Sequence, residues 1–129
     1  MNPKRNDKKG KKGFKRLKNA FSYSLNGIVS AYRDEEAFRQ IVFLSLVLIP
    51  VSFLLARSWV ELILLLLPCF LALCVELINS AIENAIDFTS LEIHPLAKKA
   101  KDMGSATQLF ALIFWAIVWI SYLIDRFIL

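Results

Sequence analysis

The sequence predicts an all-α membrane protein in which a surface helix precedes three membrane-spanning helices. Hydrophobic residues make up 57% of the 129 residues, and ten residues are Phe, which is typical of an integral membrane protein rather than of a short soluble domain. Long apolar runs follow one another from residue 37 to the C-terminus. Because the chain has the length of a single domain, we expect the spans to pack as one unit.

Residues 1–13 are rich in Lys, Gly, Asn and Asp and nearly free of apolar side chains, so we expect a disordered basic tail. Residues 1–18 carry nine Lys or Arg and one acid, Asp7, although the net charge of the chain is only +5. Positive charge beside a first span holds that end in the cytoplasm. Nucleic-acid binding is disfavoured, because the tail adjoins membrane spans and has no interleaved aromatic residues. No signal-peptide pattern precedes Phe38, so we expect the N-terminus to be retained.

Residues 14–129 are expected to form the membrane domain, beginning with an amphipathic helix over residues 14–32. Such a helix lies in the membrane interface with its apolar face down and its basic face toward the lipid headgroups. The apolar residues that recur at helical spacing are Phe14, Leu17, Phe21, Leu25, Ile28 and Val29. A turn over residues 33–36 then leads into the first span.

The three spans are predicted at residues 37–56, 60–88 and 105–124, with a polar loop over residues 91–102. Pro50 is expected to kink the first span without ending it, because the apolar run resumes at Val51. The second span has roughly 29 residues, or about 43 Å, and is longer than the hydrocarbon core of about 30 Å. Its C-terminal end is therefore expected at the cytoplasmic surface, together with the Lys-rich loop.

A polar stripe on the second span predicts the functional site. Residues 76–87 read ELINSAIENAID and directly continue an apolar run. A charged side chain at bilayer depth costs roughly 2.5 to 3.5 kcal/mol, so such residues are candidates for function by default. At 3.6 residues per turn, one helix face carries Glu76, Asn79, Ser80, Glu83 and Asp87.

The polar side chains expected at the cytoplasmic face are those needed to bind a divalent cation and a polyphosphate. Oxygen ligands suit Mg²⁺, and phosphoryl transfer requires mainly positioning, charge neutralisation and one carboxylate that accepts a hydroxyl proton. Neither a GxxxxGK[ST] loop nor a GxGxxG loop occurs, so a common soluble nucleotide-binding fold is excluded. The carboxylates are Glu35, Glu76 and Glu83, the basic residues are Arg16, Lys98 and Lys101, and the amides are Asn79 and Gln40.

The stripe and three further segments resemble the signature of the prokaryotic integral-membrane diacylglycerol kinases. These segments are EEAFRQ at residues 35–40, Glu92-Ile-His94 and AKDMGSA at residues 100–106. The resemblance covers the chain from about Phe14 to the C-terminus. It implies a homotrimer in the bacterial cytoplasmic (inner) membrane, with the N-terminus and active site cytoplasmic, that phosphorylates diacylglycerol with MgATP.

The resemblance also implies roles for individual residues. Glu76 matches the general base and Asn79 a residue that supports the reacting centre, while Glu35 and Glu83 match carboxylates that bind Mg²⁺ and ATP. The remaining positions match the ATP site at Arg16, Tyr23, Ser24, Glu92, His94, Lys101 and Asp102, and the lipid site at Arg16, Gln40, Glu76 and Ser105.

Two alternatives stay open at this point. Pro95 and the LAKK segment at residues 96–99 are closer to the related undecaprenol kinases, whereas EEAFRQ and KDMGSA favour diacylglycerol. A non-enzymatic membrane scaffold is the other alternative, in which the carboxylate stripe would only fix an oligomer interface.

Overall fold

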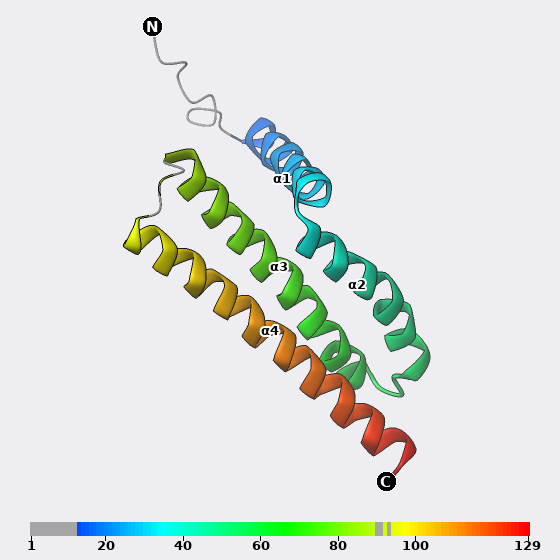
Figure 1. Ribbon diagram of the computed structural model, residues 1–129. Helices are drawn as coiled ribbons and strands as arrows, with labels where there is room; N and C mark the ends of the chain where they lie inside the picture. The colour runs from blue at the N-terminus through cyan, green and yellow to red at the C-terminus, as the bar shows by residue number, and fades with distance from the viewer. Residues whose placement is uncertain (1–12, 90–91, 93) are drawn as a thin grey trace, which may run out of the picture.

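The computed structural model describes residues 13–89, 92 and 94–129, and the predicted basic tail lies outside the described residues except for Gly13. The described residues form four helices and no strand (Figure 1). The helices are α1 (Phe14–Asp34), α2 (Glu36–Leu55), α3 (Trp59–Thr89) and α4 (Pro95–Phe127). The predicted all-α class, with a first helix followed by three long apolar helices, is confirmed.

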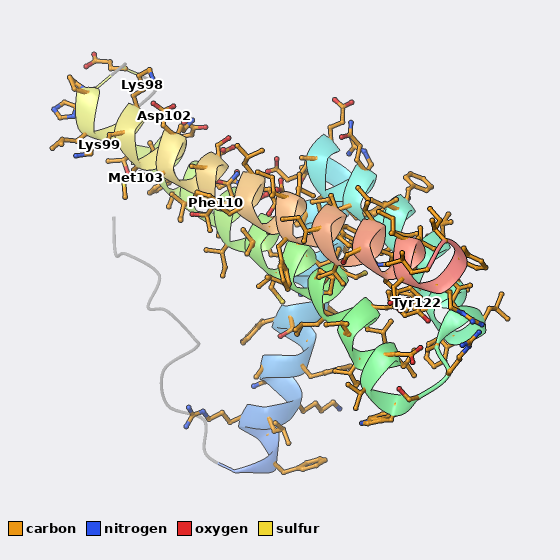
Figure 2. The ribbon with its side chains drawn as sticks, turned by 90° about the horizontal axis from the view of Figure 1, so that it is seen from below. Lys98, Lys99, Asp102, Met103, Phe110 and Tyr122 are labelled. Atoms are coloured by element: carbon orange, nitrogen blue, oxygen red, sulfur yellow. The ribbon has the colours of Figure 1, made fainter. Side chains whose placement is uncertain are left out.

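The helix α3 lies in the centre of the bundle and packs against both α4 and α2 (Figure 1). The helices α2, α3 and α4 are each long and apolar enough to cross a membrane. Many large apolar side chains on them are exposed, including Phe110 on α4 (Figure 2), as expected of surfaces that face lipid. The buried core consists of Ile41, Leu65, Cys69, Ala72, Ala111, Trp115, Trp119 and Tyr122.

The helix α1 packs against α2 and α3 and is joined to α2 by a single residue, Glu35. Glu35 has extended backbone angles, φ −108° and ψ 115°, which end the helix. Arg39 then donates from Nη1 to the carbonyl oxygens of Tyr32 (3.1 Å) and Arg33 (2.9 Å), which satisfies acceptors that the end of a helix leaves open. The predicted turn over residues 33–36 is therefore shortened to one residue.

The prediction that Pro50 does not end its helix is confirmed, since α2 continues to Leu55.

Two side chains, Tyr122 and Glu61, join the helices at the end of the bundle opposite Glu35. The O–H group of Tyr122 lies 2.9 Å from the carbonyl oxygen of Leu55 and 2.9 Å from Oε2 of Glu61. Glu61 also accepts the backbone N–H of Arg57 at 3.0 Å. Glu61 therefore has a structural role at this end of the molecule.

The prediction of a polar loop over residues 91–102 is wrong, because α4 already begins at Pro95. His94 is the N-cap, and its Nδ1 accepts the backbone N–H of Leu96 at 3.2 Å. Pro95 at the first helical position has a backbone angle suited to a helix and no N–H that would remain unsatisfied. The Lys98 to Asp102 segment thus forms the first turns of α4, and these side chains project from a helix (Figure 2).

Candidate active site

The polar stripe of α3 passes from buried to exposed along the helix. Glu76 is 4% exposed and Asn79 is 9% exposed, whereas Glu83 is half-buried and Asp87 is exposed. Glu35 and Glu83 both lie close enough to act electrostatically on the Glu76 carboxylate. The three predicted carboxylates therefore belong to one electrostatic cluster, with Glu76 as its most buried member.

Asn79 lies against Gly104 where α3 packs on α4. Its Nδ2 donates to Oε1 of Glu83 at 3.1 Å, and its Oδ1 is buried without a hydrogen-bond partner among the described residues. A Cβ atom placed on Gly104 of α4 would collide with the Asn79 amide. Only glycine at position 104 lets α4 approach this closely without displacing Asn79.

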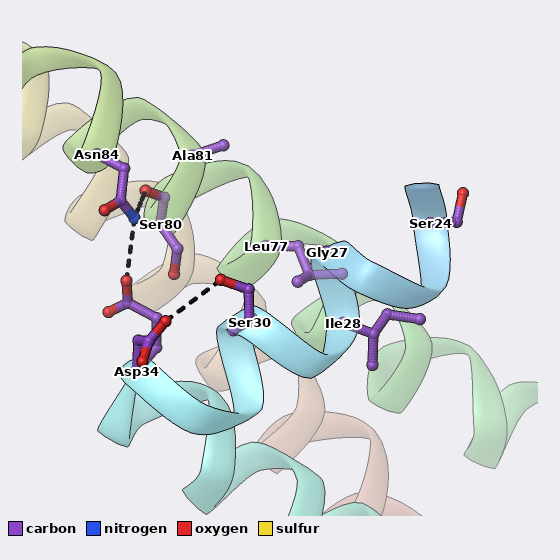
Figure 3. Close-up of a pocket in the computed structure, with 11 residues that line it drawn as sticks. Ser24, Gly27, Ile28, Ser30, Asp34, Leu77, Ser80, Ala81 and Asn84 are labelled. Carbon is purple, nitrogen blue, oxygen red and sulfur yellow. Dashed lines mark hydrogen bonds between the residues drawn. The ribbon is translucent and has the colours of Figure 1, made fainter. Parts of the chain in front are cut away.

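Glu35 reaches the stripe from the junction between α1 and α2. Its Oε1 accepts Nδ2 of Asn84 at 3.1 Å, and the same Nδ2 also donates to the carbonyl oxygen of Ser80 at 2.8 Å (Figure 3). These residues line a pocket of about 560 Å³ between α1 and α3, to which Ser24 also contributes. The pocket brings together Glu35 and Ser24 of the predicted ATP-site residues.

Lys101 lies at the exposed end of the stripe. Its Nζ is 2.6 Å from Oδ1 of Asp87, which ties the beginning of α4 to the end of α3. Asp102 is paired with Lys98 one helical turn away at 2.5 Å. Both predicted nucleotide-site residues on α4 therefore already have charged partners within the chain.

The other predicted site residues are more widely distributed. Glu92 and His94 line a second pocket of about 420 Å³ with Ile86, Thr89 and Ala97, and this pocket shares no residue with the first. The remaining predicted positions are exposed: Arg16 and Tyr23 on α1, Gln40 on α2 and Ser105 on α4. Within one chain, the described residues thus do not bring all the predicted ATP-site residues into one pocket.

The carboxylates Glu35 and Glu83 have the chemistry required to bind Mg²⁺ with ATP. Each accepts a hydrogen bond from an Asn amide on one oxygen, which leaves further lone pairs available. Among the described residues, no group of three or more His, Cys, Asp or Glu gathers to form a complete metal site. This set fits Mg²⁺, which commonly takes one or two protein carboxylates and completes its shell with phosphate oxygens and water.

Comparison with protein families matches residues 22–123 to the family described as prokaryotic diacylglycerol kinase. The chain belongs to this family. It is 56% identical over 117 residues to a diacylglycerol kinase of Helicobacter pylori, with 91% of each chain covered. It is 54% identical to one of Pseudomonas aeruginosa, covering 90% of this chain and 94% of the relative. It is 37% identical to one of Escherichia coli K12, covering 89% and 94%.

Sequence reasoning missed several residues that lie beside the candidate site. Asn84 connects Glu35 to α3, Gly104 sets the distance between α3 and α4, and Gln108 buries a side-chain amide on α4. Asn84 stands beside Glu83 in the stripe, and Gly104 lies within KDMGSA, so both had a signal in the sequence. The sequence signal for Gln108 is weaker, because it is a single amide in a largely apolar run.

Proposed function

We propose that this chain transfers the γ-phosphoryl group of ATP to the hydroxyl group of 1,2-diacylglycerol, giving phosphatidate and ADP. Membership of the diacylglycerol kinase family supports this activity. The observation that carries it is the burial of the Glu76 carboxylate on an apolar helix, on the same face as Glu83. A buried carboxylate in a span is costly, which makes it a candidate for function by default.

In the proposed reaction, Glu76 is the general base. The lipid hydroxyl oxygen attacks the γ-phosphorus, the bond from that phosphorus to the bridging oxygen of ADP breaks, and the hydroxyl proton passes to Glu76. Asn79 donates a hydrogen bond to Glu83 and lies one turn from Glu76 on the same face of α3, so we propose that it supports the reacting centre. Mg²⁺, held by Glu35 and Glu83, would supply neutralisation of the phosphate charge.

ATP is proposed to bind at the exposed end of the stripe. Arg16 and Lys101 are proposed phosphate contacts, because Lys and Arg neutralise polyphosphate charge. Tyr23, Ser24, Glu92, His94 and Asp102 are proposed nucleotide contacts, and Gln40 and Ser105 are proposed to adjoin the lipid. The proposed active form is a homotrimer, as the family resemblance implies, and the separation of these positions within one chain fits a site that is shared between subunits.

The proposed location is the bacterial cytoplasmic (inner) membrane, with the N-terminus and the active site facing the cytoplasm. The positive-inside rule supports this orientation, because Lys and Arg concentrate before α1 and at the beginning of α4. Three apolar helices would then place the C-terminus on the outer side.

The test is transfer of labelled phosphate from ATP to diacylglycerol in mixed micelles by purified Glu76→Gln protein. We expect transfer to be nearly abolished while the oligomer is retained, because Gln has nearly the same shape and cannot accept a proton. Glu61→Gln is the matched control: it makes the same change at the opposite end of α3 and should retain transfer. Intact transfer in Glu76→Gln would remove Glu76 as the base. If the wild-type protein shows no transfer and Glu76→Gln disrupts the oligomer, the scaffold alternative is favoured.

Undecaprenol is the second candidate acceptor, favoured by Pro95 and the segment that follows it. Diacylglycerol and undecaprenol should be compared side by side in the same micelles. A strong preference for the polyprenol would overturn the proposed acceptor and leave the proposed base unaffected.

A further inference from the structure

Gln108 presents a buried amide without a partner in the middle of the bundle. It is 8% exposed, and both Oε1 and Nε2 are buried with no hydrogen-bond partner among the described residues. Burying an amide away from water is unfavourable unless the amide forms hydrogen bonds inside the protein. Such a group therefore calls for a specific explanation.

The packing of α3 against α4 places Gln108 level with Glu76. Asn79 meets α4 at Gly104, and Trp119 donates from Nε1 to the carbonyl oxygen of Leu65 at 3.2 Å. The helices are thus antiparallel, and each step along α4 matches a step of about the same rise back along α3. Gln108 lies one turn after Gly104 on α4, and Glu76 lies about one turn before Asn79 on α3. Gln108 and Glu76 are therefore at about the same level along the helix pair.

The other polar side chains on this face of α4 have structural explanations. Trp119 and Tyr122 are bonded to backbone carbonyl oxygens of α3 and α2 respectively. The indole N–H of Trp115 has no partner among the described residues, but its large ring fills the apolar core. Gln108 has neither a partner nor an aromatic ring to fill the core, so packing does not account for it.

We propose that Gln108 contacts the lipid acceptor and positions its hydroxyl-bearing polar end beside Glu76. An amide both donates and accepts hydrogen bonds, so it can bind a hydroxyl or an ester carbonyl oxygen while Glu76 takes the proton. Binding there would replace the missing hydrogen bonds of the free protein. This inference rests on the proposed lipid kinase function and adds a residue to its acceptor site.

The experiment compares Gln108→Met and Gln108→Leu with the wild-type protein in diacylglycerol mixed micelles. Both variants keep approximately the side-chain volume and remove the amide. We expect kcat/KM for the lipid to fall about tenfold or more, as the loss of one buried hydrogen bond implies. The KM for MgATP should not change. Thr107→Val is the matched control, an isosteric loss of polarity at the adjacent exposed position of α4, and should retain full activity.

Thermal inactivation separates this role from a structural one. If Gln108 serves the lipid, removing an unsatisfied amide leaves the midpoint unchanged or raises it, while lipid turnover falls. Unchanged lipid kinetics in both variants, or a lowered midpoint with lipid and ATP parameters damaged together, would overturn the inference. Failure of the proposed function is distinct: the wild type itself would then not phosphorylate diacylglycerol. If the wild type prefers the polyprenol, the same comparison is made with that acceptor.

Discussion

Replacing Gly104 by Ala tests the close contact between α3 and α4 on which the candidate site depends. An added Cβ would collide with the Asn79 amide, which is buried and bonded to Glu83. Accommodation requires either that α4 moves away or that Asn79 rotates and gives up this hydrogen bond. We therefore expect Gly104→Ala to lower both the stability and the phosphoryl transfer rate.

The magnitude follows from two opposing effects. Overpacking a well-packed contact typically costs about 1 to 3 kcal/mol. Replacing a mid-helix glycine by Ala raises the free energy of unfolding by roughly 0.5 to 1 kcal/mol, because glycine loses more conformational freedom on folding. Gly27→Ala is the matched control, since it is also within a helix and its added Cβ meets nothing within 4 Å. The control should be neutral or stabilising, and the two variants should differ by about 1 to 3 kcal/mol.

The assay is thermal or denaturant unfolding of the purified protein in detergent, followed by the transfer rate of each variant. A double-mutant cycle with Asn79→Ala isolates the contact, because removing the amide makes room for the new methyl group. The double variant should be more stable than the sum of the single effects allows. Equal stability of Gly104→Ala and Gly27→Ala, or strictly additive effects in the cycle, would refute the contact.

Two further predictions concern the two ends of the bundle. Tyr122→Phe should destabilise the protein by about 1 kcal/mol in unfolding measurements, because the O–H group shared by Leu55 and Glu61 is lost. Its kcat should stay unchanged, and a large loss of turnover would contradict a structural role for this end. Glu35→Gln and Glu83→Gln should each raise the Mg²⁺ concentration needed for half-maximal transfer. No change in either variant would place the metal elsewhere.

Much of the fold could be predicted from the sequence because lipid imposes strong constraints on the chain. A span must be a long apolar helix, so composition alone located α2 and α3 to within a few residues. The predicted beginning of the last helix is wrong because the charged Lys98 to Asp102 segment is typical of a loop. The relevant signal was local: His94 as N-cap and Pro95 at the first helical position outweigh the polarity of the next turns.

The site was less predictable, because periodicity reports which residues share a face and not which helix meets that face. The spacing of Glu76, Asn79 and Glu83 placed them correctly on one side of α3. The register between α3 and α4 is set by packing at Gly104 and Trp119, which no single-helix pattern contains. Gln108 became a candidate only when that register aligned it with Glu76.

The burial gradient along α3 separates two environments that the proposed reaction must join. A lipid hydroxyl arrives from the hydrocarbon side, where Glu76 is buried, whereas a nucleotide arrives from water, where Asp87 is exposed and Lys101 is partly exposed. Seven residues separate Glu76 from Glu83, a rise of about 10 Å along one helix. Because the helix is rigid, this spacing is fixed without any loop. Asn79 lies between the two carboxylates and is bonded to Glu83, so a change at Asn79 or at Gly104 beside it should disturb the lipid and nucleotide sides together.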